Sequence, residues 1–519
     1  MTYEEQLQEL RTELNDCDRA LLETLDRRRA LSLKVAALKQ AAGKPVLDPD
    51  REGELLCRLG RSTGRPEEVR ELYQTVLRQS RGAQRAAAEQ ERVDDGAVAY
   101  GLLGESLVHS LSPELHSLLG FCGADDYRLV NRRPEELDRF FAESRFAGLN
   151  VTIPYKEKVL PYCRRLSPEA AAIGAVNTLR READGSLSGF NTDLEGFRFS
   201  LRRLGFSPAG KLCLVLGSGG AGKMACWCLT QAGAQAVCIS RKGPVTYEML
   251  DRYRDAALLV NATPVGMYPY GDECPVKLER FPALEAVLDL VYRPYRTKLV
   301  LAAESRQIPA LGGLPMLAAQ AMLSERIWQG QEPGEPDEGM VEEAVDKLLK
   351  AHQNLVLVGM PGSGKSTQAR ILAGLLKRPV FDTDDAFRYF YGCAPGVFIR
   401  TYGEPAFRQE ESTVVRELAR KEGIVLSTGG GAVLAPENRA ALKQNGRIIL
   451  LTRPLENLST FGRPLSQGSG ALERMERERL PIYRAAAELE IPVEGRKYET
   501  AELIIRRALG EEYLPKDKL

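Results

Sequence analysis

Several features that mark common protein classes are missing from this 519-residue sequence. Lysine plus arginine and aspartate plus glutamate both total 71, so no excess charge favours nucleic acid or an anionic membrane as partner. No apolar run approaches the roughly 20 residues of a membrane span, and the opening MTYEEQLQEL lacks the apolar core of a signal peptide. The ten cysteines form no C-x-x-C pair. We therefore expect reduced thiols and a cytoplasmic protein.

The chain is longer than the size at which one hydrophobic core stops growing, so we expect about three or four domains. The composition, with 44% hydrophobic and 27% charged residues, is that of ordinary folded proteins. Changes of pattern separate three regions, at 1–90, 91–350 and 351–519.

A glycine-rich stretch in the middle region, KLCLVLGSGGAGKM at 211–224, predicts a dinucleotide site. The apolar run Leu212–Leu216 predicts a strand, and a helical pattern follows from Lys223. The G-x-G-x-x-G spacing between them permits a tight turn and a close approach to pyrophosphate, which the helix N-terminus can bind. The alternative is a strand-turn-helix whose glycines bind nothing. The predicted contacts are Gly217, Gly219, Gly220, Ala221 and Gly222.

The end of the next predicted strand, Ala236–Ile239, indicates which dinucleotide binds. An NAD site usually carries an acidic residue about 20 residues after the loop, for the ribose hydroxyls. Here the strand runs into Ser240, Arg241 and Lys242. Two cations at this place favour the 2′-phosphate of NADP, the alternative being a solvated basic turn.

The first region predicts a helical module. Apolar residues recur three or four positions apart from Leu7 to Leu38, which predicts one amphipathic helix of about 40 residues. The shorter helices predicted at 48–61 and 66–84 cannot cover it, so we expect a homodimer with intertwined N-terminal helices. Its cations could converge on a small dianion or form a solvated face.

Several motifs of this region resemble the all-helical chorismate mutases: LQELR at 7–11, RRR at 27–29, PVLDPDRE at 45–52 and SRGAQ at 80–84. The resemblance implies a cofactor-free rearrangement of chorismate to prephenate, in which the enzyme holds the folded conformer and stabilises charge on the ether oxygen. The alternative is a bifunctional enzyme whose first module is a non-catalytic dimerisation or effector-binding module. The implied residues are Arg11, Arg28 and Arg51 for substrate charge, Lys39 and Gln84 for the ether oxygen, Asp48 and Glu52 for the ring hydroxyl, and Ser80.

The middle region places a lysine, Lys156, just past a predicted strand at 148–153, where it is a candidate proton donor. The order of six blocks resembles the shikimate dehydrogenases: YGLLGESLVHSLSP (100–113), NVTIPYK (150–156), GAVNT (174–178), GFNTDLEG (189–196), VNATPVGMYP (260–269) and LPMLAAQA (314–321). The resemblance implies reversible reduction of 3-dehydroshikimate to shikimate by NADPH, with Lys156 and Asp193 as the acid/base pair. The implied substrate contacts are Ser110, Ser112, Thr152, Asn177, Tyr292 and Gln320.

Two points of this resemblance stay open. The basic turn reads SRKG rather than the family's more usual asparagine-arginine-threonine, so the NADP prediction rests on Arg241 and Lys242. Quinate stays a possible second substrate. We expect His109 and His116 to be structural.

In the last region, the predicted strand Asn354–Val358 leads into GMPGSGKST, which satisfies G-x-x-x-x-G-K-[ST] at 359–366. Backbone N–H groups of such a loop cradle the phosphates of ATP, its lysine reaches the β and γ phosphates, and its hydroxyl binds Mg²⁺. The predicted nucleotide contacts are Gly362, Ser363, Gly364, Lys365, Ser366 and Thr367, with Ser366 and Asp382 as the predicted metal-site residues.

The segments that follow resemble the shikimate kinases, with acidic Asp382 and Asp384, then GEPAFRQE (403–410), STGGG (427–431) and RLPIYR (479–484). The resemblance implies transfer of the γ-phosphate of ATP to the 3-hydroxyl of shikimate. Asp384 would position that hydroxyl, and Arg463 would be the lid arginine. The implied acceptor contacts are Arg408, Arg479, Gly429, Gly430 and Gly431. The lid region is shorter than usual, and another polyol or a nucleotide stays open as acceptor.

The predicted fold is therefore multidomain. An all-α module at 1–90 precedes an α/β dehydrogenase at 96–350, which has a substrate domain (96–200 and 311–350) and a Rossmann-like NADP domain (201–310). A P-loop α/β kinase domain follows at 351–519. The two latter activities are consecutive steps of one route to the aromatic amino acids, whereas chorismate arises later in that route. We predict a trifunctional enzyme with small-molecule substrates and neither nucleic acid nor membrane as partner.

Overall fold

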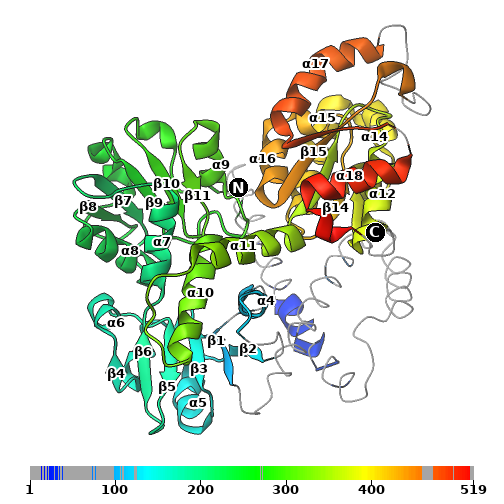
Figure 1. Cartoon of the computed structure of the whole chain (residues 1–519). Coiled ribbons are helices and arrows are strands. Elements are labelled where there is room, and N and C mark those ends of the chain that lie inside the picture. The colour runs from blue at the N-terminus through cyan, green and yellow to red at the C-terminus, as the bar shows by residue number, and fades with distance from the viewer. Residues whose placement is uncertain are drawn as a thin grey trace, which may run out of the picture. The chain divides into compact units, whose positions relative to one another are not determined.

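The computed structural model of the chain describes residues 99–514 except 106, 108, 109, 122–125, 269, 270, 272, 459–470 and 495. It also describes residues 73 and 76 and a scattered set between 13 and 38 (Figure 1), all of them helical as the periodicity predicts. The chain divides into two units, one formed by 1–110 with 126–154 and the other by 111–125 with 155–519.

The first unit contains three parallel strands in the order β2-β1-β3. Tyr100 of the central strand lies opposite Tyr127 on one side and Gly148 on the other. The aliphatic strand residues Leu103, Val130 and Leu149 are fully buried, as expected for a parallel sheet. The elements are β1 (Tyr100–Gly104), β2 (Tyr127–Asn131), η1 (Pro134–Glu136), α5 (Leu137–Glu143) and β3 (Gly148–Val151).

Two helices of the second unit, α7 and α10, pack closely against each other. The close approach of these helices depends on Gly196 of α7, where an added Cβ would lie 2.8 Å from the Met316 carbonyl oxygen. Residues of α4 and α11 pack on the same apolar cluster as α10. The elements are α4 (Ser112–Leu118), η2 (Leu160–Tyr162), β4 (Arg165–Leu166), α6 (Pro168–Ile173), β5 (Thr178–Arg181), β6 (Leu187–Phe190), α7 (Asp193–Arg203), α10 (Leu314–Trp328) and α11 (Glu338–His352).

A five-stranded parallel sheet of the order β11-β10-β9-β7-β8 follows α7 in the chain. Its strands are buried on both faces: Val215 of β7 packs with Met224 of α8, and Leu214 packs with Leu299 of α9. The elements are β7 (Leu212–Leu216), α8 (Gly220–Gln231), β8 (Gln235–Ile239), η3 (Tyr247–Tyr253), β9 (Leu258–Asn261), η4 (Leu278–Arg280), β10 (Ala286–Asp289), α9 (Lys298–Ser305) and β11 (Ala310–Leu311).

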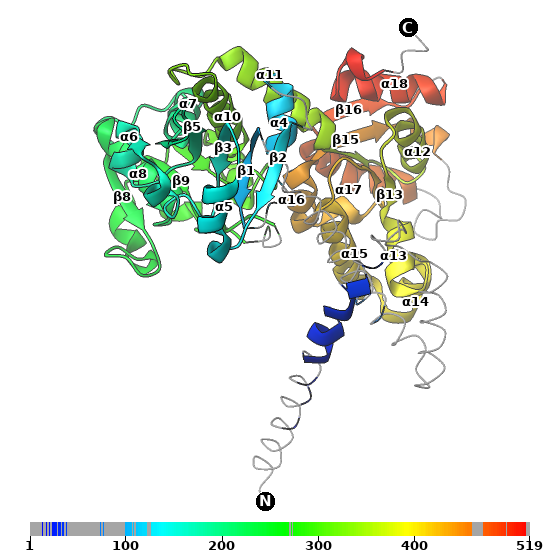
Figure 2. The same cartoon turned by 90° about the horizontal axis from the view of Figure 1, so that it is seen from below.

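The last region forms another five-stranded parallel sheet, β13-β14-β12-β15-β16. Figure 2 shows α12 and α18 on one side of this sheet and α15 on the other. The elements are β12 (Asn354–Val358), α12 (Lys365–Leu376), β13 (Val380–Asp382), α13 (Thr383–Tyr391), α14 (Pro395–Tyr402), α15 (Glu404–Ala419), β14 (Val425–Ser427), η5 (Ala432–Leu434), α16 (Pro436–Asn445), β15 (Gly446–Thr452), η6 (Leu455–Asn457), α17 (Ala471–Ala486), β16 (Leu489–Pro492), α18 (Lys497–Ala508) and η8 (Glu511–Tyr513).

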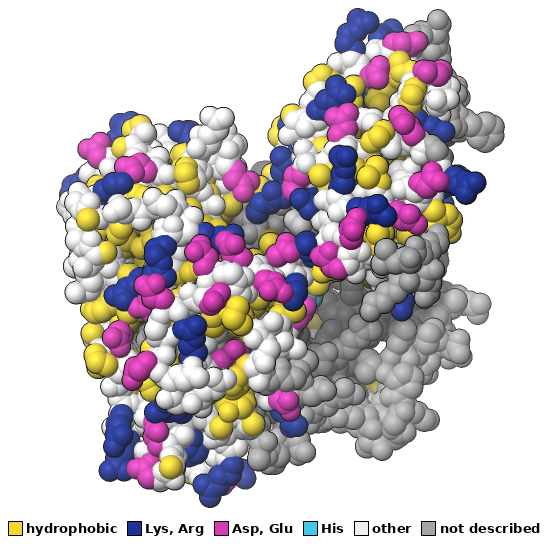
Figure 3. All heavy atoms as spheres, viewed as in Figure 1, with side chains coloured by type: hydrophobic (Ala, Val, Ile, Leu, Met, Phe, Trp, Pro, Cys, Tyr) yellow, Lys and Arg dark blue, Asp and Glu magenta, His cyan; other side chains and the backbone are white. Residues whose placement is uncertain are grey.

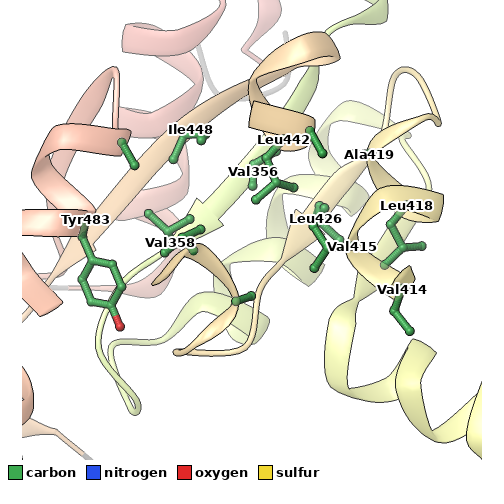
Figure 4. Packing of buried hydrophobic residues seen from close by; sticks show 14 of the residues in the cluster. Val356, Val358, Val414, Val415, Leu418, Ala419, Leu426, Leu442, Ile448 and Tyr483 are labelled. Atoms are coloured by element: carbon green, nitrogen blue, oxygen red, sulfur yellow. The ribbon is translucent and has the colours of Figure 1, made fainter. Parts of the chain in front are cut away.

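Alternation along β12 explains how this sheet is covered on both faces. Val356 and Val358 pack with Leu426 and Ile448 toward α15 and α16 (Figure 4). Leu355 and Leu357 point to the opposite face and pack toward α12 and α18. Tyr483 closes one end of this cluster with its ring, while its hydroxyl donates to the Gly430 carbonyl oxygen at 2.5 Å. The packed core therefore reaches directly to the glycine segment after β14.

The predicted strands Leu212–Leu216 and Asn354–Val358 have the bounds that the structure shows. The helix after the first glycine loop begins at Gly220, three residues earlier than predicted, because Gly219 already serves as its N-cap. Figure 3 shows Lys and Arg interspersed with Asp and Glu on the visible face, as the balanced charge suggests. Among the described residues, no helix is both long and apolar enough to span a membrane.

Candidate active sites

Lys156 and Asp193 are 37 positions apart in sequence but form an ion pair in the second unit. The Lys156 Nζ donates to Asp193 Oδ2 at 2.6 Å, and the two side chains are 20% and 11% exposed. Asp193 is the first residue of α7, and Lys156 lies in the loop before η2. The exposure leaves the ammonium accessible to a small molecule while its carboxylate partner fixes its position.

A buried amide network surrounds this carboxylate. Asn177 Nδ2 lies 2.9 Å from Asp193 Oδ1, 3.0 Å from Thr192 Oγ1 and 3.3 Å from Gln320 Oε1. Asn177 and Gln320 are 2% and 7% exposed, so their orientations are fixed by these contacts rather than by solvent. The sequence analysis missed Thr192, whose backbone N–H donates to Asn177 Oδ1 at 2.8 Å. Its place in the NTD tripeptide, directly before Asp193, was the available signal.

The other predicted substrate contacts are divided between the two units. Ser110 and Thr152 belong to the first unit, where Thr152 follows β3 directly and its Cγ2 packs near Gly104. Ser112 is buried at the start of α4 in the second unit. Tyr292 also belongs to the second unit and packs against the apolar cluster of α4, α10 and α11, and burial raises the pKa of its phenol.

His116 is structural, as predicted. It is fully buried, and its Nδ1 lies 2.6 Å from Glu325 Oε1 on α10. Burial raises the pKa of Glu325, although His116 opposes that rise. The contact ties α4 to α10.

The dinucleotide loop after β7 has the tight geometry that its glycines predict. Gly217 has a φ of 110°, and a Cβ there would lie 2.8 Å from the Ala262 carbonyl oxygen. A Cβ on Gly222 would lie only 1.9 Å from the Gly217 carbonyl oxygen. The loop therefore closes on itself and leaves the N-terminal turn of α8 open to a ligand, which fits the pyrophosphate of a dinucleotide.

The basic turn lies at the end of the neighbouring strand β8. Arg241 and Lys242 are exposed, whereas Ser240 is 9% exposed and its backbone N–H donates to the Val245 carbonyl oxygen at 3.1 Å. Two exposed cations beside the carboxyl end of β7 fit a phosphate on the adenosine ribose better than free hydroxyls.

Asp289 at the end of β10 is a buried acidic residue that the sequence patterns did not single out. It is fully buried and accepts hydrogen bonds from Asn261 Nδ2 at 2.9 Å, the Val291 N–H at 3.0 Å and Thr297 Oγ1 at 2.6 Å. Burial raises its pKa to about 6, against the lowering effect of these donors. The carboxylate thus fixes the base of the loop that carries Tyr292.

The loop of the last sheet encloses its lysine. Gly359, Gly362 and Gly364 all have positive φ, of 143°, 88° and 97°. Lys365 is 8% exposed, and its Nζ donates to the carbonyl oxygens of Gly359 at 2.9 Å and Met360 at 3.0 Å. These two hydrogen bonds position the ammonium inside the loop.

Ser366 and Asp382 meet at the carboxyl ends of β12 and β13, where the Ser366 hydroxyl donates to Asp382 Oδ2 at 2.9 Å. Hydroxyl and carboxylate oxygens are ligands that Mg²⁺ prefers. The described residues hold no cluster of three or more His, Cys, Asp and Glu suited to a metal. Ser366 and Asp382, the two predicted metal-site residues, are therefore brought together by the structure.

The glycine segment after β14 lets functional side chains approach the backbone. A Cβ on Gly431 would lie 2.2 Å from an Arg408 guanidinium nitrogen, and one on Gly429 would lie 2.9 Å from Asp384 Oδ1. Glu411, which the sequence analysis missed, accepts from Arg408 Nη1 at 2.7 Å and is 4% exposed. Burial raises the pKa of Glu411, and Arg408 opposes that rise. Arg408 is thereby fixed with its planar group over the glycines.

Arg479 on α17 lies on the same segment, since a Cβ on Gly430 would be 3.7 Å from one of its guanidinium nitrogens. The structure thus brings the predicted acceptor contacts Arg408, Arg479 and Asp384 to one glycine segment. Two cations and a carboxylate around bare backbone fit a ring with one carboxylate and several hydroxyls.

Several predicted site residues lie outside the described residues: Arg11, Lys39, Asp48, Arg51, Glu52, Ser80, Gln84, His109 and Arg463. Arg28 is described and lies, half-buried, on a helix.

Comparison with protein families finds three matches along the chain. Residues 10–85 match chorismate mutase type II, 102–179 match the shikimate dehydrogenase substrate binding domain, and 361–508 match shikimate kinase. Similar proteins include the shikimate dehydrogenase (NADP(+)) of Moorella thermoacetica, 35% identical over 271 residues, or 47% of this chain and 91% of that protein. That of Methanopyrus kandleri is 37% identical over 288 residues, covering 49% and 98%.

Solved structures with similarity include a chorismate mutase/shikimate 5-dehydrogenase fusion protein from Clostridium acetobutylicum. It is 34% identical, and the match covers 49% of this chain and 97% of that one with a TM-score of 0.45. Shikimate dehydrogenase 1 from Peptoclostridium difficile is 31% identical over 48% of this chain and 97% of that one, with a TM-score of 0.44.

Proposed function

Because the chain belongs to the shikimate dehydrogenase family through about half of its length, we propose that it reduces 3-dehydroshikimate to shikimate at Lys156 and Asp193. The observation that carries this proposal is the 2.6 Å ion pair beside the buried Asn177 and Gln320 amides. NADPH, when bound between the Gly217 loop and the basic turn, supplies the hydride.

The residues of the chain then perform the proton chemistry. A ketone oxygen that gains charge needs a proton, which Lys156 donates from its Nζ while Asp193 holds the ammonium in place. Asn177 and Gln320 bind substrate hydroxyls, together with Ser110, Ser112, Thr152 and Tyr292. Buried donors and acceptors of this kind reject a molecule that leaves them without partners, whereas quinate keeps these hydroxyls and is compared with shikimate in the assay below.

Steady-state oxidation of shikimate by NADP⁺ tests the proposal. Lys156→Met is expected to lower kcat by about 10² to 10⁴, with a smaller change in the KM for NADP⁺. Asp193→Asn is expected to give an intermediate loss because the ammonium stays but its orienting charge is gone. Full activity in Lys156→Met would refute the assigned role, and quinate oxidation compared in the same assay defines the second substrate.

For the last region we propose phosphorylation of the shikimate 3-hydroxyl by ATP. Lys365 and the loop N–H groups bind the phosphates, Asp384 orients the attacking hydroxyl, and Arg408 with Arg479 binds the carboxylate. The ring lies against Gly429, Gly430 and Gly431, and Arg463 acts from the lid. Ser366 and, through water, Asp382 would hold Mg²⁺, which neutralises phosphate charge when bound.

An acceptor assay distinguishes this function from phosphorylation of another polyol or a nucleotide. Arg408→Ala is expected to raise the KM for shikimate by about 10² while the KM for ATP stays near its original value, because a charge-assisted bidentate contact is lost. Phosphorylation of a nucleotide in preference to shikimate by the unaltered chain would overturn the proposal.

For residues 1–90 we propose chorismate mutase activity in a homodimer. The described helical residues Leu31, Val35 and Leu38 are 55%, 46% and 72% exposed at helical spacing, which supports an apolar stripe that a second copy covers. Substrate would contact Arg11, Arg28, Lys39, Asp48, Arg51, Glu52, Ser80 and Gln84.

Conversion of chorismate to prephenate by the full chain, with Lys39→Ala as control, tests this activity. Turnover that Lys39→Ala abolishes supports a trifunctional enzyme. No turnover in a preparation whose other two reactions proceed would make this region a dimerisation or effector-binding module. We propose a cytoplasmic location, which the free thiols of the eight described cysteines support.

A further inference from the structure

Two loops of the dehydrogenase region extend from the carboxyl ends of adjacent strands. The loop after β9 starts at Ala262 and abuts the dinucleotide loop, since a Cβ on Gly217 would meet the Ala262 carbonyl oxygen. The loop after β10, residues 290–297, carries Tyr292. Asp289 ties the bases of both loops together through Asn261 and Thr297. Ligands of open parallel sheets bind at this edge.

The outer part of the 290–297 loop contacts the kinase region. Arg293 Nη2 donates to Glu422 Oε2 at 2.5 Å, and the side chains are only 19% and 18% exposed. The hydroxyl of Tyr295 lies 3.4 Å from the same carboxylate oxygen. Glu422 therefore accepts from two side chains that follow Tyr292 within three positions.

The turn from α16 to β15 holds the same loop from a second direction. The Tyr295 N–H donates to Asn445 Oδ1 at 3.2 Å, and the Arg296 N–H donates to the Gln444 carbonyl oxygen at 3.0 Å. Asn445 is fully buried, and its Nδ2 also donates to the Tyr268 hydroxyl of the β9 loop at 3.1 Å. One kinase turn thus contacts both dehydrogenase loops, near the α9 and α16 helices that lie side by side in Figure 1.

The guanidinium of Arg296 extends this contact over the kinase backbone. Its Nε donates to the Lys443 carbonyl oxygen at 2.9 Å, and its Nη2 donates to the Gly446 carbonyl oxygen at 3.0 Å and to Glu488 at 2.7 Å. Gln444 adds a hydrogen bond to the Gly271 carbonyl oxygen at 2.8 Å. Backbone carbonyl oxygens, amide side chains and the Glu422 and Glu488 carboxylates all pair across the contact, which is the pattern of a fixed interface.

The two regions use opposite edges of their sheets in this contact. The dehydrogenase contributes loops from the carboxyl ends of β9 and β10, where its ligands bind. In the kinase region, Glu422 and Asn445 precede the amino ends of β14 and β15, whereas the ATP loop and Gly429 follow carboxyl ends. Loss of the contact should therefore affect substrate binding at the dehydrogenase site more than binding or catalysis at the kinase site.

We propose that Glu422 and Asn445 are positioning residues for the dehydrogenase reaction, supplied by the kinase region of the same chain. They hold the 290–297 loop, and through it Tyr292, in the arrangement that binds shikimate. This inference rests on the proposed dehydrogenase function. The dehydrogenase reaction then depends on contacts from the kinase region, whereas the kinase reaction does not depend on the dehydrogenase region.

The test compares both activities of the full chain in single variants. Glu422→Ala is expected to raise the dehydrogenase KM for shikimate about tenfold, because loss of one partner of a buried ion pair leaves the other to rearrange. The KM for NADP⁺ and both kinase parameters are expected to change less than about twofold, since Glu422 itself contacts neither the dinucleotide loop nor the kinase site. Glu422→Gln keeps an acceptor for Tyr295 and is expected to restore the KM to within about threefold of the parent.

Controls make each outcome decisive. Glu417→Ala removes an exposed pair between the end of α15 and its C-cap Arg420, close in sequence to Glu422, and should change nothing. Asn445→Ala removes no charge and should raise the shikimate KM about threefold. If Glu422→Ala also loses kinase activity through misfolding, the shikimate KM of Asn445→Ala becomes the test of the inference. An unchanged shikimate KM in Glu422→Ala and Asn445→Ala overturns the inference.

Amide hydrogen exchange separates this inference from the proposed function. Faster exchange of residues 290–297 in Glu422→Ala, with unchanged exchange in Glu417→Ala, is expected whatever the chain oxidises. A parent chain that does not oxidise shikimate would refute the proposed function, and unchanged exchange would refute the positioning.

Discussion

The two five-stranded parallel sheets of the chain each carry a glycine-rich loop after one strand, β7 in one sheet and β12 in the other, and these two loops differ in depth. The loop after β7 has one glycine of positive φ, Gly217, and its helix starts from an extended N-cap, Gly219. The loop after β12 has three such glycines, and its helix starts from a left-handed N-cap, Gly364. The second loop is long enough to surround a side chain, whereas the first is filled by its own backbone.

This difference decides where the positive charge for phosphate comes from. In the loop after β12, the cation is Lys365, which is buried within the loop. In the dehydrogenase loop, the cations Arg241 and Lys242 come from the end of the next strand and are exposed. A buried cation acts in a low dielectric, whereas exposed cations are screened. Under the functions we propose, the buried cation would serve phosphoryl transfer and the exposed cations would serve the choice of cofactor.

Removal of the buried cation should have the largest effect. Lys365→Ala is expected to lower the kinase kcat by about 10³, because a preorganised charge at the transferring phosphoryl group is lost. Shikimate oxidation by the same preparation should be unchanged and serves as the control for folding. Retention of a tenth or more of the kinase rate would show that the loop N–H groups alone carry the phosphates.

The acidic residues at the strand ends of the two sheets also differ in burial. Asp289 at the end of β10 is completely buried, whereas Asp382 at the end of β13 is partly exposed. The pKa of Asp289 is about 6 in the folded chain against 3.8 as the reference value. As pH rises from about 4 to about 6, the unfolded chain loses this proton first, so the free energy of unfolding falls by roughly 3 kcal/mol from this group.

The measurement is amide hydrogen exchange of β9 and β10 at several pH values, compared with Asp289→Asn. The difference in the free energy of opening between the parent chain and Asp289→Asn should fall as the pH rises from about 4 to about 6, and it should be constant above pH 6. A difference that does not vary with pH would show that Asp289 ionises normally.

The depth of the first loop makes it sensitive to a single methyl group. Gly222→Ala places a Cβ 1.9 Å from the Gly217 carbonyl oxygen, so the loop must move. We expect a loss of about 10² in dehydrogenase kcat/KM for NADP⁺, the usual result of an ångström-scale displacement at a site. Gly374→Ala on α12, which meets open space, is the matched control and should leave both activities unchanged.

Local patterns were sufficient to predict the strands, the glycine loops and their helices, because those features depend on residues close in sequence. The bounds of β7 and β12 were predicted correctly. The helix after β7 begins three residues earlier than predicted, because Gly219 is its N-cap. The proximity of Lys156 to Asp193 could be expected only through family resemblance. Glu411, Asp289 and the Arg293 to Glu422 contact have no local signal, since each depends on where distant strands end.

The exposed cations should have the smallest effect and the most selective one. The double variant Arg241→Ala with Lys242→Ala is expected to raise the KM for NADP⁺ roughly tenfold, because charge-assisted contacts to the 2′-phosphate are lost. The KM for NAD⁺ should stay within about twofold, since NAD⁺ has no phosphate there. Arg254→Ala, which removes an exposed cation at the end of η3, is the control. Because these charges are open to solvent, the NADP⁺ effect should also shrink as salt is raised, which the loss in Lys365→Ala should not do. An equal rise in both KM values would show that the turn shapes the loop rather than reading the phosphate.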